Sequence, residues 1–494
     1  MMDRTPGLVA LAAPHPAAVE AGRTMVAAGG NALDAALAAA AALTVAYPHQ
    51  CSIGGDLVAV VRPAGGRPRA VVSAGAAAAA IDVEALRAGG ATRMPAYGPM
   101  TVTVPGVVAG WAAVAGLGAR LSWADRLGPA IALARGGVPV SPGLAGAVRE
   151  EADRLAADPG LAAVFAGLAE GDALVQPALA ESLEALAADW STVYRGPLAG
   201  RLVAGLRRLG SPLSGADFAA HRAEITEPLT ASAYGAEWAA APPPSQGATF
   251  LAVLGSGDPL PRARDARLAR DALLGDPRTG PVDLDGLLLR GGSPPPAGAE
   301  GPRPSGDTVA VSAVGADGTA VSLIQSLFHG FGAGLLDPDT GIVLHNRGSM
   351  FRLDPHHPGR IEPGSRPPHT LCPTVAVGED TVLAVGCQGG RSQPWILAQL
   401  AADALAGDDP AAVVARPRWI IDGPEPVLVL EPGVPGAHEL AARASGLGLA
   451  VTTVPGAHDG AGHVQIARLR GAGLDAASDP RADGIGAVLR PGPE

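Results

Sequence analysis

The stretch SGDTVAVSAVGADGTAVSLIQS, residues 305–326, has the pattern of a β-hairpin. Val309, Val311 and Ala313 alternate with smaller or polar residues, which predicts a half-buried strand. Asp317-Gly318 is a strong short-range signal for a hairpin turn, and a second apolar strand follows it. The hairpin opens with Gly-Asp-Thr, so Thr308 stands at the very start of its first strand.

The segment just before this hairpin has the composition of a linker. Residues 291–307 begin GGSPPPAGAEGPRPSG, and this Pro/Gly-rich run forms neither a core nor a regular strand ladder. We expect it to separate a helix-rich part, residues 1–307, from a strand-rich part, residues 308–494. The strands and the one long helix predicted after it are 308–314, 319–325, 341–344, 372–377, 381–386 and 392–406.

Thr308 is a candidate nucleophile because of this placement. A threonine can use its own α-amine as the base that takes its proton, with a reference pKa of about 7.7–8.0. That requires cleavage of the peptide bond between Asp307 and Thr308. A loose segment before the bond and a rigid strand after it suit such a cleavage, although an ordinary threonine at the start of a strand fits the same pattern.

The composition narrows the classes of function. The net charge of −11 argues against a broad nucleic-acid surface, and the 48% hydrophobic content supplies a large core. Three widely spaced cysteines, with no basic and apolar leader and no run long enough to span a membrane, lead us to expect a cytoplasmic protein. SIGGD, residues 52–56, lacks the spacing of a dinucleotide fingerprint, so no cofactor is expected. Neither is a metal, since His356-His357 lie between prolines in a loop-like segment.

Ordered motifs along nearly the whole chain resemble the γ-glutamyltranspeptidase family of N-terminal nucleophile hydrolases. The hairpin and FGAGLLDPDTGIVLHNRG resemble the start of its small subunit. The other motifs, in family order, are APHPAAVEAGRTMVAAGGNALDAALAAAAALTV, SIGGD, VTVPGVVAGW, PALAESLEALA, EPL, PPPSQG, RPPHTLCPT, GCQGG and SDPRADG. The resemblance implies an α+β fold, a four-layer αββα sandwich to which both parts contribute strands. It also implies self-cleavage before Thr308 and an αβ heterodimer of the two fragments.

The same resemblance assigns roles to individual residues. Thr308 would be the nucleophile of both cleavage and catalysis, and Ser326 the hydroxyl that contacts it from the facing strand. Asn346 matches an active-site asparagine. Gly389 and Gly390 match the pair whose backbone amides stabilise the oxyanion, a task suited to donors that are fixed in advance.

Departures from the family pattern bear on the substrate. Met350, after Ser349, replaces the aspartate that holds a substrate amine. VVSAGAAAAA, residues 71–80, lacks the arginine that holds an α-carboxylate, and His369-Thr370 replace a serine pair. An α-amino acid head group would leave its charges unpaired, which is costly in a closed site. We therefore expect no γ-glutamyl transfer from glutathione.

LHNRG, FRLDPHHP and PGSRPPHT resemble instead the oxamate amidohydrolase and acylase-like branch of the family. Arg347, His369 and Arg391, with Thr370 beside them, are then candidates to bind a small carboxylate or carbonyl, although Arg347 could equally form a structural ion pair and His369 an internal hydrogen bond.

The expected function is hydrolysis of an amide of a small, non-γ-glutamyl substrate. Two alternatives stay open at this point. One is hydrolysis of a carbon–carbon bond next to a carbonyl. The other is a non-catalytic scaffold that is never cleaved, suggested by Val309-Ala310 where relatives often have Thr-His.

Overall fold

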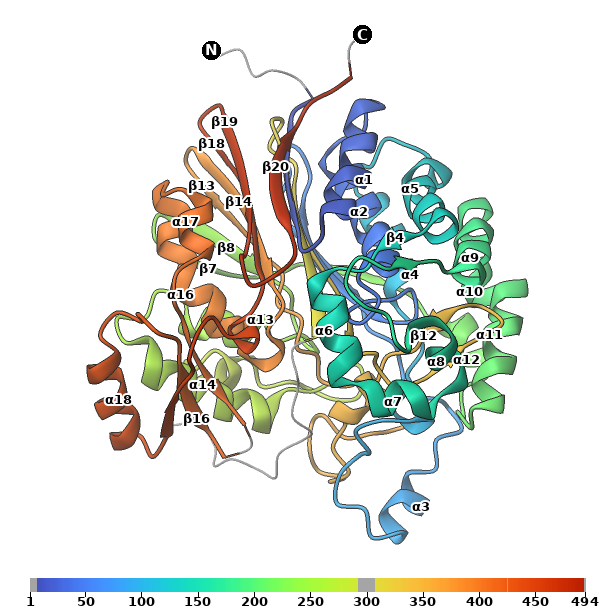
Figure 1. Ribbon diagram of the computed structural model, residues 1–494. Helices are drawn as coiled ribbons and strands as arrows, with labels where there is room; N and C mark the ends of the chain where they lie inside the picture. The colour runs from blue at the N-terminus through green and yellow to red at the C-terminus, as the bar shows by residue number, and fades with distance from the viewer. Residues whose placement is uncertain (1–6, 292–306, 424, 493–494) are drawn as a thin grey trace.

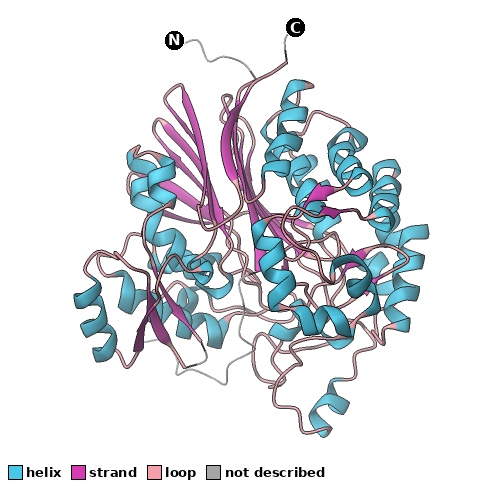
Figure 2. Ribbon diagram, viewed as in Figure 1, coloured by secondary structure: helices cyan, strands magenta, loops and turns pink. Residues whose placement is uncertain are grey.

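Two antiparallel sheets lie face to face between two layers of helices in the computed structural model, which describes residues 7–291, 307–423 and 425–492 (Figure 1). The predicted linker, residues 291–307, therefore lies outside the described residues except at its two ends. The four-layer αββα sandwich expected from the sequence is confirmed. Figure 2 shows the strands in the middle of the molecule and the helices on its two flanks.

The first sheet has seven strands, and the hairpin occupies its centre. Its order is β20 (Ile485–Leu489), β1 (Val9–Ala13), β9 (Asp307–Gly315), β10 (Ala320–Phe328), β2 (Asp56–Arg62), β3 (Arg69–Ser73) and β6 (Glu224–Thr226). The turn between β9 and β10 is the predicted one, with Gly318 at a φ of +82°. The predicted half-burial of the first strand is wrong, because β9 and β10 are buried on both faces.

The second sheet has six strands and also mixes the two parts of the chain. Its order is β19 (Gly473–Ser478), β18 (Val464–Arg470), β14 (Thr381–Cys387), β13 (Thr374–Gly378), β8 (Ala236–Ala240) and β7 (Leu229–Ala233). Between the sheets lie mostly small side chains, such as Ala10, Ala239, Ala310 and Ala467. Gly386 lies so close that an added Cβ would stand 3.3 Å from the Ala310 Cβ.

The helices of the first flank cover the outer face of the seven-stranded sheet, where Val309 and Val311 join the largest hydrophobic cluster. Asn31 caps the second helix in a reciprocal capping box with Asp34. These helices are α1 (Pro16–Ala27), α2 (Ala32–Ala46), α4 (Val107–Ala115), α5 (Trp123–Gly136), α6 (Pro142–Glu150), α7 (Ala152–Ala157), α8 (Pro159–Phe165), α9 (Pro177–Ala188), α10 (Thr192–Arg195), α11 (Pro197–Arg208) and α12 (Gly215–Ala220).

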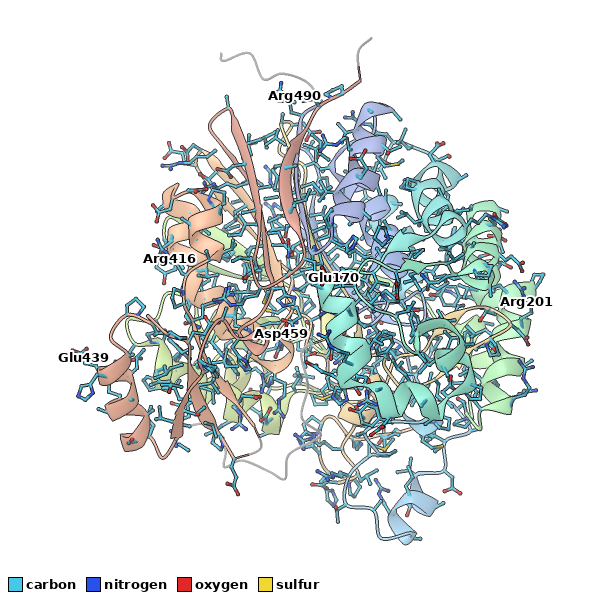
Figure 3. All side chains as sticks on the ribbon, in the orientation of Figure 1. Glu170, Arg201, Arg416, Glu439, Asp459 and Arg490 are labelled. Carbon is cyan, nitrogen blue, oxygen red and sulfur yellow. The ribbon has the colours of Figure 1, made fainter. Side chains whose placement is uncertain are left out.

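The second flank packs on the outer face of the six-stranded sheet through a separate hydrophobic cluster that includes Trp238 and Trp395. Its helices are α13 (Gly247–Val253), α14 (Pro259–Leu273), α15 (Leu284–Leu287), α16 (Gln393–Ala406), α17 (Pro410–Val414) and α18 (Ala437–Gly446). Charged side chains such as Arg201 and Glu439 project outward from the two flanks (Figure 3). None of the described helices is both long and apolar enough to cross a bilayer.

Smaller elements complete the chain. Helix α3 (Val83–Ala88) extends from one edge (Figure 1). The short strands are β4 (Val138–Pro139), β5 (Ala173–Leu174), β11 (Leu336–Asp337), β12 (Ile342–Val343), β15 (Trp419–Asp422), β16 (Val427–Leu430) and β17 (Ala450–Thr453). The described part of the chain also has four single turns of 3₁₀ helix: η1 (Pro99–Thr101), η2 (Arg347–Met350), η3 (Gly390–Ser392) and η4 (Asp459–Ala461).

Candidate active site

Thr308, Ser326 and Asp56 form a row across three neighbouring strands of the seven-stranded sheet. Thr308 on β9 is in register with Ser326 on β10, which is in register with Asp56 on β2. Directly opposed residues in antiparallel strands share one face. That face looks toward the second sheet, because Ser322, four residues before Ser326, donates a hydrogen bond to the Val385 carbonyl of β14. The row therefore lies at one end of the packed layer between the two sheets.

The hydroxyl of Ser326 connects the candidate nucleophile with the carbonyl next to it. The Thr308 and Ser326 hydroxyl oxygens are 2.9 Å apart, and Ser326 Oγ donates to the Asp307 carbonyl at 3.0 Å. Because one hydroxyl has one proton, the hydrogen bond between the two side chains is then donated by Thr308. The Thr308 hydroxyl proton thus points at Ser326.

A β-bulge fixes the Ser326 side chain in this position. The register of β10 shifts between Ser326 and Phe328, and Phe328 has a φ of +81°, which is rare for a bulky residue. The bulge lets the Phe328 N–H donate to Ser326 Oγ at 2.8 Å. Backbone strain of this kind persists only where the surrounding structure enforces it, and here it orients one hydroxyl.

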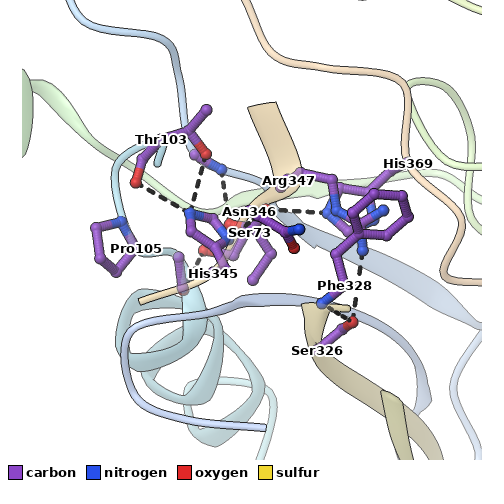
Figure 4. A network of polar contacts seen from close by, with 12 residues as sticks. Ser73, Thr103, Pro105, Ser326, Phe328, His345, Asn346, Arg347 and His369 are labelled. Atoms are coloured by element: carbon purple, nitrogen blue, oxygen red, sulfur yellow. Dashed lines mark hydrogen bonds and ion pairs between the residues drawn. The ribbon is translucent and has the colours of Figure 1, made fainter. Parts of the chain in front are cut away.

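Arg347 places a buried guanidinium beside this hydroxyl (Figure 4). Its Nη1 donates to Thr370 Oγ1 at 3.0 Å, its Nη2 lies 3.5 Å from Ser326 Oγ, and its guanidinium stacks on the Phe328 ring at 4.2 Å. Burial lowers the pKa of Arg347 to about 9, against the opposing effect of Asp56. No carboxylate in the described part of the chain forms an ion pair with this guanidinium, and its Nε has no hydrogen-bond partner there.

Asp56 contacts two histidines, His345 and His369, close to Arg347. The sequence reasoning did not identify Asp56 as a site residue. Its Oδ2 accepts from His369 Nε2 at 3.0 Å and lies 3.4 Å from His345 Nδ1, while its Oδ1 accepts from the Gly75 N–H. Burial alone would raise the pKa of Asp56, but the two histidines and Arg347 outweigh it and lower that pKa. Its position as the last residue of the SIGGD motif was the sequence signal that could have identified Asp56.

His369 is neutral near pH 7. Burial, reinforced by Arg347, lowers the pKa of His369 to about 4. Its one ring proton lies on Nε2, since that nitrogen donates to Asp56, and its Nδ1 is a buried acceptor without a partner among the described residues. His345 donates its own Nε2–H to the Thr103 carbonyl at 3.0 Å.

The Gly389-Gly390 segment follows strand β14 at the same end of the layer between the sheets. Gly389 and Gly390 have φ angles of +136° and +50°, a backbone path that favours glycine at both positions. Neither N–H has a hydrogen-bond acceptor among residues 7–291, 307–423 and 425–492. Two such amides are available as donors to an oxygen atom.

Asn346 and Arg391, two other sequence candidates, have their side chains committed elsewhere. The Asn346 side-chain amide donates to the Ala96 carbonyl at 2.7 Å, and its oxygen accepts from the His329 N–H at 3.1 Å. These two hydrogen bonds hold the loop after β10 in position. The Arg391 guanidinium forms an ion pair with Asp271. These contacts favour a structural role for both.

The positions where the sequence departs from the family pattern are buried beside the site. Met350 is 9% exposed, and the Ser349 hydroxyl donates to the Asn346 carbonyl at 2.8 Å. Neither side chain brings a charge that could hold an amine. No group of three or more His, Cys, Asp or Glu side chains within the described residues is arranged to bind a metal.

Two sheets packed face to face between two helical layers are the architecture of the class of N-terminal nucleophile hydrolases. The chain matches the sequence profile named gamma-glutamyltranspeptidase over residues 18–266 and 292–489. It therefore belongs to the gamma-glutamyltranspeptidase family, and like the members it resembles it is an enzyme.

Two curated relatives and one solved structure illustrate the similarity. The oxamate amidohydrolase proenzyme of Klebsiella pneumoniae is 36% identical, over 96% of this chain and 97% of its own. A glutathione hydrolase-like proenzyme of Bacillus subtilis is 35% identical, over 82% of this chain and 84% of its own. The crystal structure of cephalosporin acylase from Bacillus halodurans has a TM-score of 0.87 at 30% identity, covering 97% of this chain and 95% of that chain.

Proposed function

We propose that the chain cleaves itself between Asp307 and Thr308. The observation that carries this proposal is the hydrogen-bonded set formed by the Thr308 hydroxyl, the Ser326 hydroxyl and the Asp307 carbonyl. Thr308 Oγ1 attacks the Asp307 carbonyl carbon and passes its proton through Ser326. The C–N bond then breaks, the nitrogen takes up the proton, and an ester joins Asp307 to Thr308 Oγ1. Water hydrolyses the ester to the Asp307 carboxylate and restores the Thr308 hydroxyl.

The two fragments, residues 1–307 and 308–494, stay together as an αβ heterodimer in this proposal. Strands β9 and β10 of the second fragment lie between β1 and β2 of the first, with antiparallel pairing on both sides. Separation would break both ladders and expose the hydrophobic clusters on either face, which is strongly unfavourable.

In the mature enzyme the freed Thr308 amine acts as the base for its own hydroxyl. The hydroxyl attacks the carbonyl carbon of a substrate amide, and the amide N–H groups of Gly389 and Gly390 stabilise the negative oxygen that forms. The C–N bond of the substrate breaks, the leaving amine takes the proton from Thr308, and water hydrolyses the acyl-enzyme. The products are a carboxylic acid and an amine or ammonia.

Arg347 and His369 support a proposal for the substrate class. A buried guanidinium with no carboxylate partner among the described residues is suited to bind the carboxylate of a substrate, and Thr370 holds it in place. His369 Nδ1 offers an acceptor for an N–H or O–H donor nearby. We propose a small amide with a carboxylate close to the scissile carbonyl, and the named activity of the Klebsiella relative makes oxamate the first probe.

Ammonia release tests this function. The purified chain should hydrolyse oxamate with a kcat/KM at least about 100-fold above that for its neutral ester methyl oxamate, because only the acid pairs with Arg347. Glutathione, included because of the Bacillus relative, would release glutamate and cysteinylglycine in place of ammonia. Its turnover, followed by the release of glutamate, should be poor. Thr308→Ala should abolish turnover of every substrate.

Variants of Arg347 separate charge from geometry in the same assay. Arg347→Lys keeps the cation but loses the planar fork, so KM for oxamate should rise by about 10-fold, and Arg347→Met should raise it further. Arg201→Met, at an exposed position on α11, is the control. Turnover of glutathione as efficient as that of oxamate would contradict the proposed substrate class.

A further inference from the structure

Gln246 has a buried carboxamide whose hydrogen bonds reach both sides of the candidate site. It lies in the PPPSQG turn between β8 and α13, and it is fully buried. Its Nε2 donates to the Gly390 carbonyl at 2.9 Å and also to the Thr370 carbonyl. Both amide hydrogens are therefore used, one on the glycine segment and one on the segment that holds Arg347.

Arg270 of α14 completes this arrangement. Its Nη1 donates to Gln246 Oε1 at 3.0 Å and to the Arg391 carbonyl at 2.7 Å. Asp271, the next residue, accepts from Arg270 Nε at 3.0 Å and forms the ion pair with the Arg391 side chain. The carboxamide is thus fixed at its oxygen as well as at its nitrogen.

These bonds set the orientation of successive peptide planes. The Ser392 N–H donates to the Gly389 carbonyl at 2.8 Å, in the peptide plane that carries the Gly390 N–H. Gln246 and the Gln393 N–H both donate to the Gly390 carbonyl in the next plane, and Arg270 donates to the Arg391 carbonyl. Two consecutive glycines have many accessible backbone conformations, so such a segment needs external contacts to keep its N–H groups pointed in one direction.

We propose that Gln246 is a positioning residue that, supported by Arg270, holds the Gly389-Gly390 segment in the orientation needed to stabilise the oxyanion. The inference rests on the proposed function, in which those two amides bind the developing negative oxygen. Gln246 also ties the glycine segment to Thr370, and so fixes the place of the oxyanion relative to the carboxylate-binding Arg347.

The two reactions of the chain should depend on Gln246 differently. In self-cleavage the Asp307 carbonyl accepts from Ser326, which Gln246 does not contact. In substrate hydrolysis the charge falls on an oxygen at the glycine amides. A misplaced donor would stabilise the transition state less, while the binding of the substrate stays the same. We therefore expect kcat to fall and KM to stay nearly constant.

The test uses Gln246→Glu, which keeps the length of the side chain but removes both N–H donors, and Gln246→Met, which removes them without adding a charge. With oxamate as the probe, both variants should lose at least about 10-fold in kcat, with KM within about 3-fold. Their self-cleavage, followed on a denaturing gel, should proceed within about 2-fold of the unmodified rate.

Gln399→Glu is the matched control. Gln399 on α16 also donates to two backbone carbonyls, those of Trp395 and Trp419, each at 2.9 Å. The same chemical change there should leave kcat unchanged.

Several outcomes would overturn the inference: an unchanged kcat in both Gln246 variants, a rise in KM alone, a loss of self-cleavage, or an equal loss of kcat in Gln399→Glu. Turnover that persists in Thr308→Ala would instead overturn the proposed function itself.

Discussion

Removal of the Ser326 hydroxyl tests most directly the proposed chemistry at the 307–308 bond, as distinct from the stability of the fold around it. Its hydroxyl donates a hydrogen bond to the Asp307 carbonyl at 3.0 Å and accepts one from the Thr308 hydroxyl at 2.9 Å. Ser326→Ala removes a donor to the developing oxyanion and should slow self-cleavage by about 100-fold. A time course on a denaturing gel measures the rate.

Ser322→Ala is the control at the same scale. Ser322 is four residues earlier on the same face of β10, and its hydroxyl donates a hydrogen bond to the Val385 carbonyl at 2.9 Å. Self-cleavage of this variant should be unaffected. If Ser326→Ala cleaved as fast as Ser322→Ala, the proposed role of the Ser326 hydroxyl would be wrong.

The hairpin is the element that brings Thr308 and Ser326 together, and its register is set by its turn. Gly318 has a φ of +82°, a conformation that costs about 1 kcal/mol or more for a residue with a Cβ. Gly318→Ala should therefore lower the free energy of unfolding by about 1 kcal/mol. Chemical denaturation in the Thr308→Ala background, where a single chain is expected, measures the change.

Gly146→Ala provides a control of opposite sign. Gly146 lies inside helix α6, and nothing stands within 4 Å of the Cβ that alanine would add. This change should raise the free energy of unfolding by about 0.5–1 kcal/mol, because alanine favours the helix. A stabilising effect of Gly318→Ala would show that the turn does not have this backbone conformation.

The strands and turn of the hairpin could be predicted because their signals are local. Alternation and Asp317-Gly318 indicate the hairpin, and an in-register return places Ser326 opposite Thr308. The burial of its second face could not be predicted, because it depends on the other sheet, whose strands come from distant parts of the chain.

The site shows the same division between local and distant information. His369 stood out as a departure from the family pattern, and Arg347 through the resemblance of LHNRG to the oxamate amidohydrolase branch. The contact between His369 and Asp56 joins residues 313 positions apart, and only the packing of β2 beside β10 brings Asp56 to the site. Arg391 was a candidate to bind substrate, but its side chain forms an ion pair with Asp271. That contact depends on the packing of α14, which the sequence does not indicate.

At the scale of the whole molecule, buried neutral histidines make stability depend on pH. Burial is the largest cause that lowers the pKa of His49 to about 3, and the pKa values of His221 and His369 to about 4. These side chains stay neutral in the folded protein, whereas the unfolded chain takes up protons below its ordinary histidine pKa of about 6.5. Unfolding thus becomes more favourable as pH falls.

Between pH 6.5 and about 4 each of these histidines should remove about 1.4 kcal/mol of stability per pH unit. Chemical denaturation of the Thr308→Ala chain at pH 7, 6 and 5 measures the slope. A free energy of unfolding that is flat from pH 7 to 5 would contradict the buried, neutral state of the three side chains.

The central claim, that Thr308 cleaves the chain before itself, is tested by the fragments that the purified protein contains. Intact-mass measurement with N-terminal sequencing should find two polypeptides, residues 1–307 and 308–494, the second beginning Thr-Val-Ala-Val. Thr308→Ala should yield one uncleaved chain, whereas Thr374→Ala, at another buried threonine, should be cleaved normally. A persistent single chain in the unmodified protein, or the same cleavage in Thr308→Ala, would contradict the account.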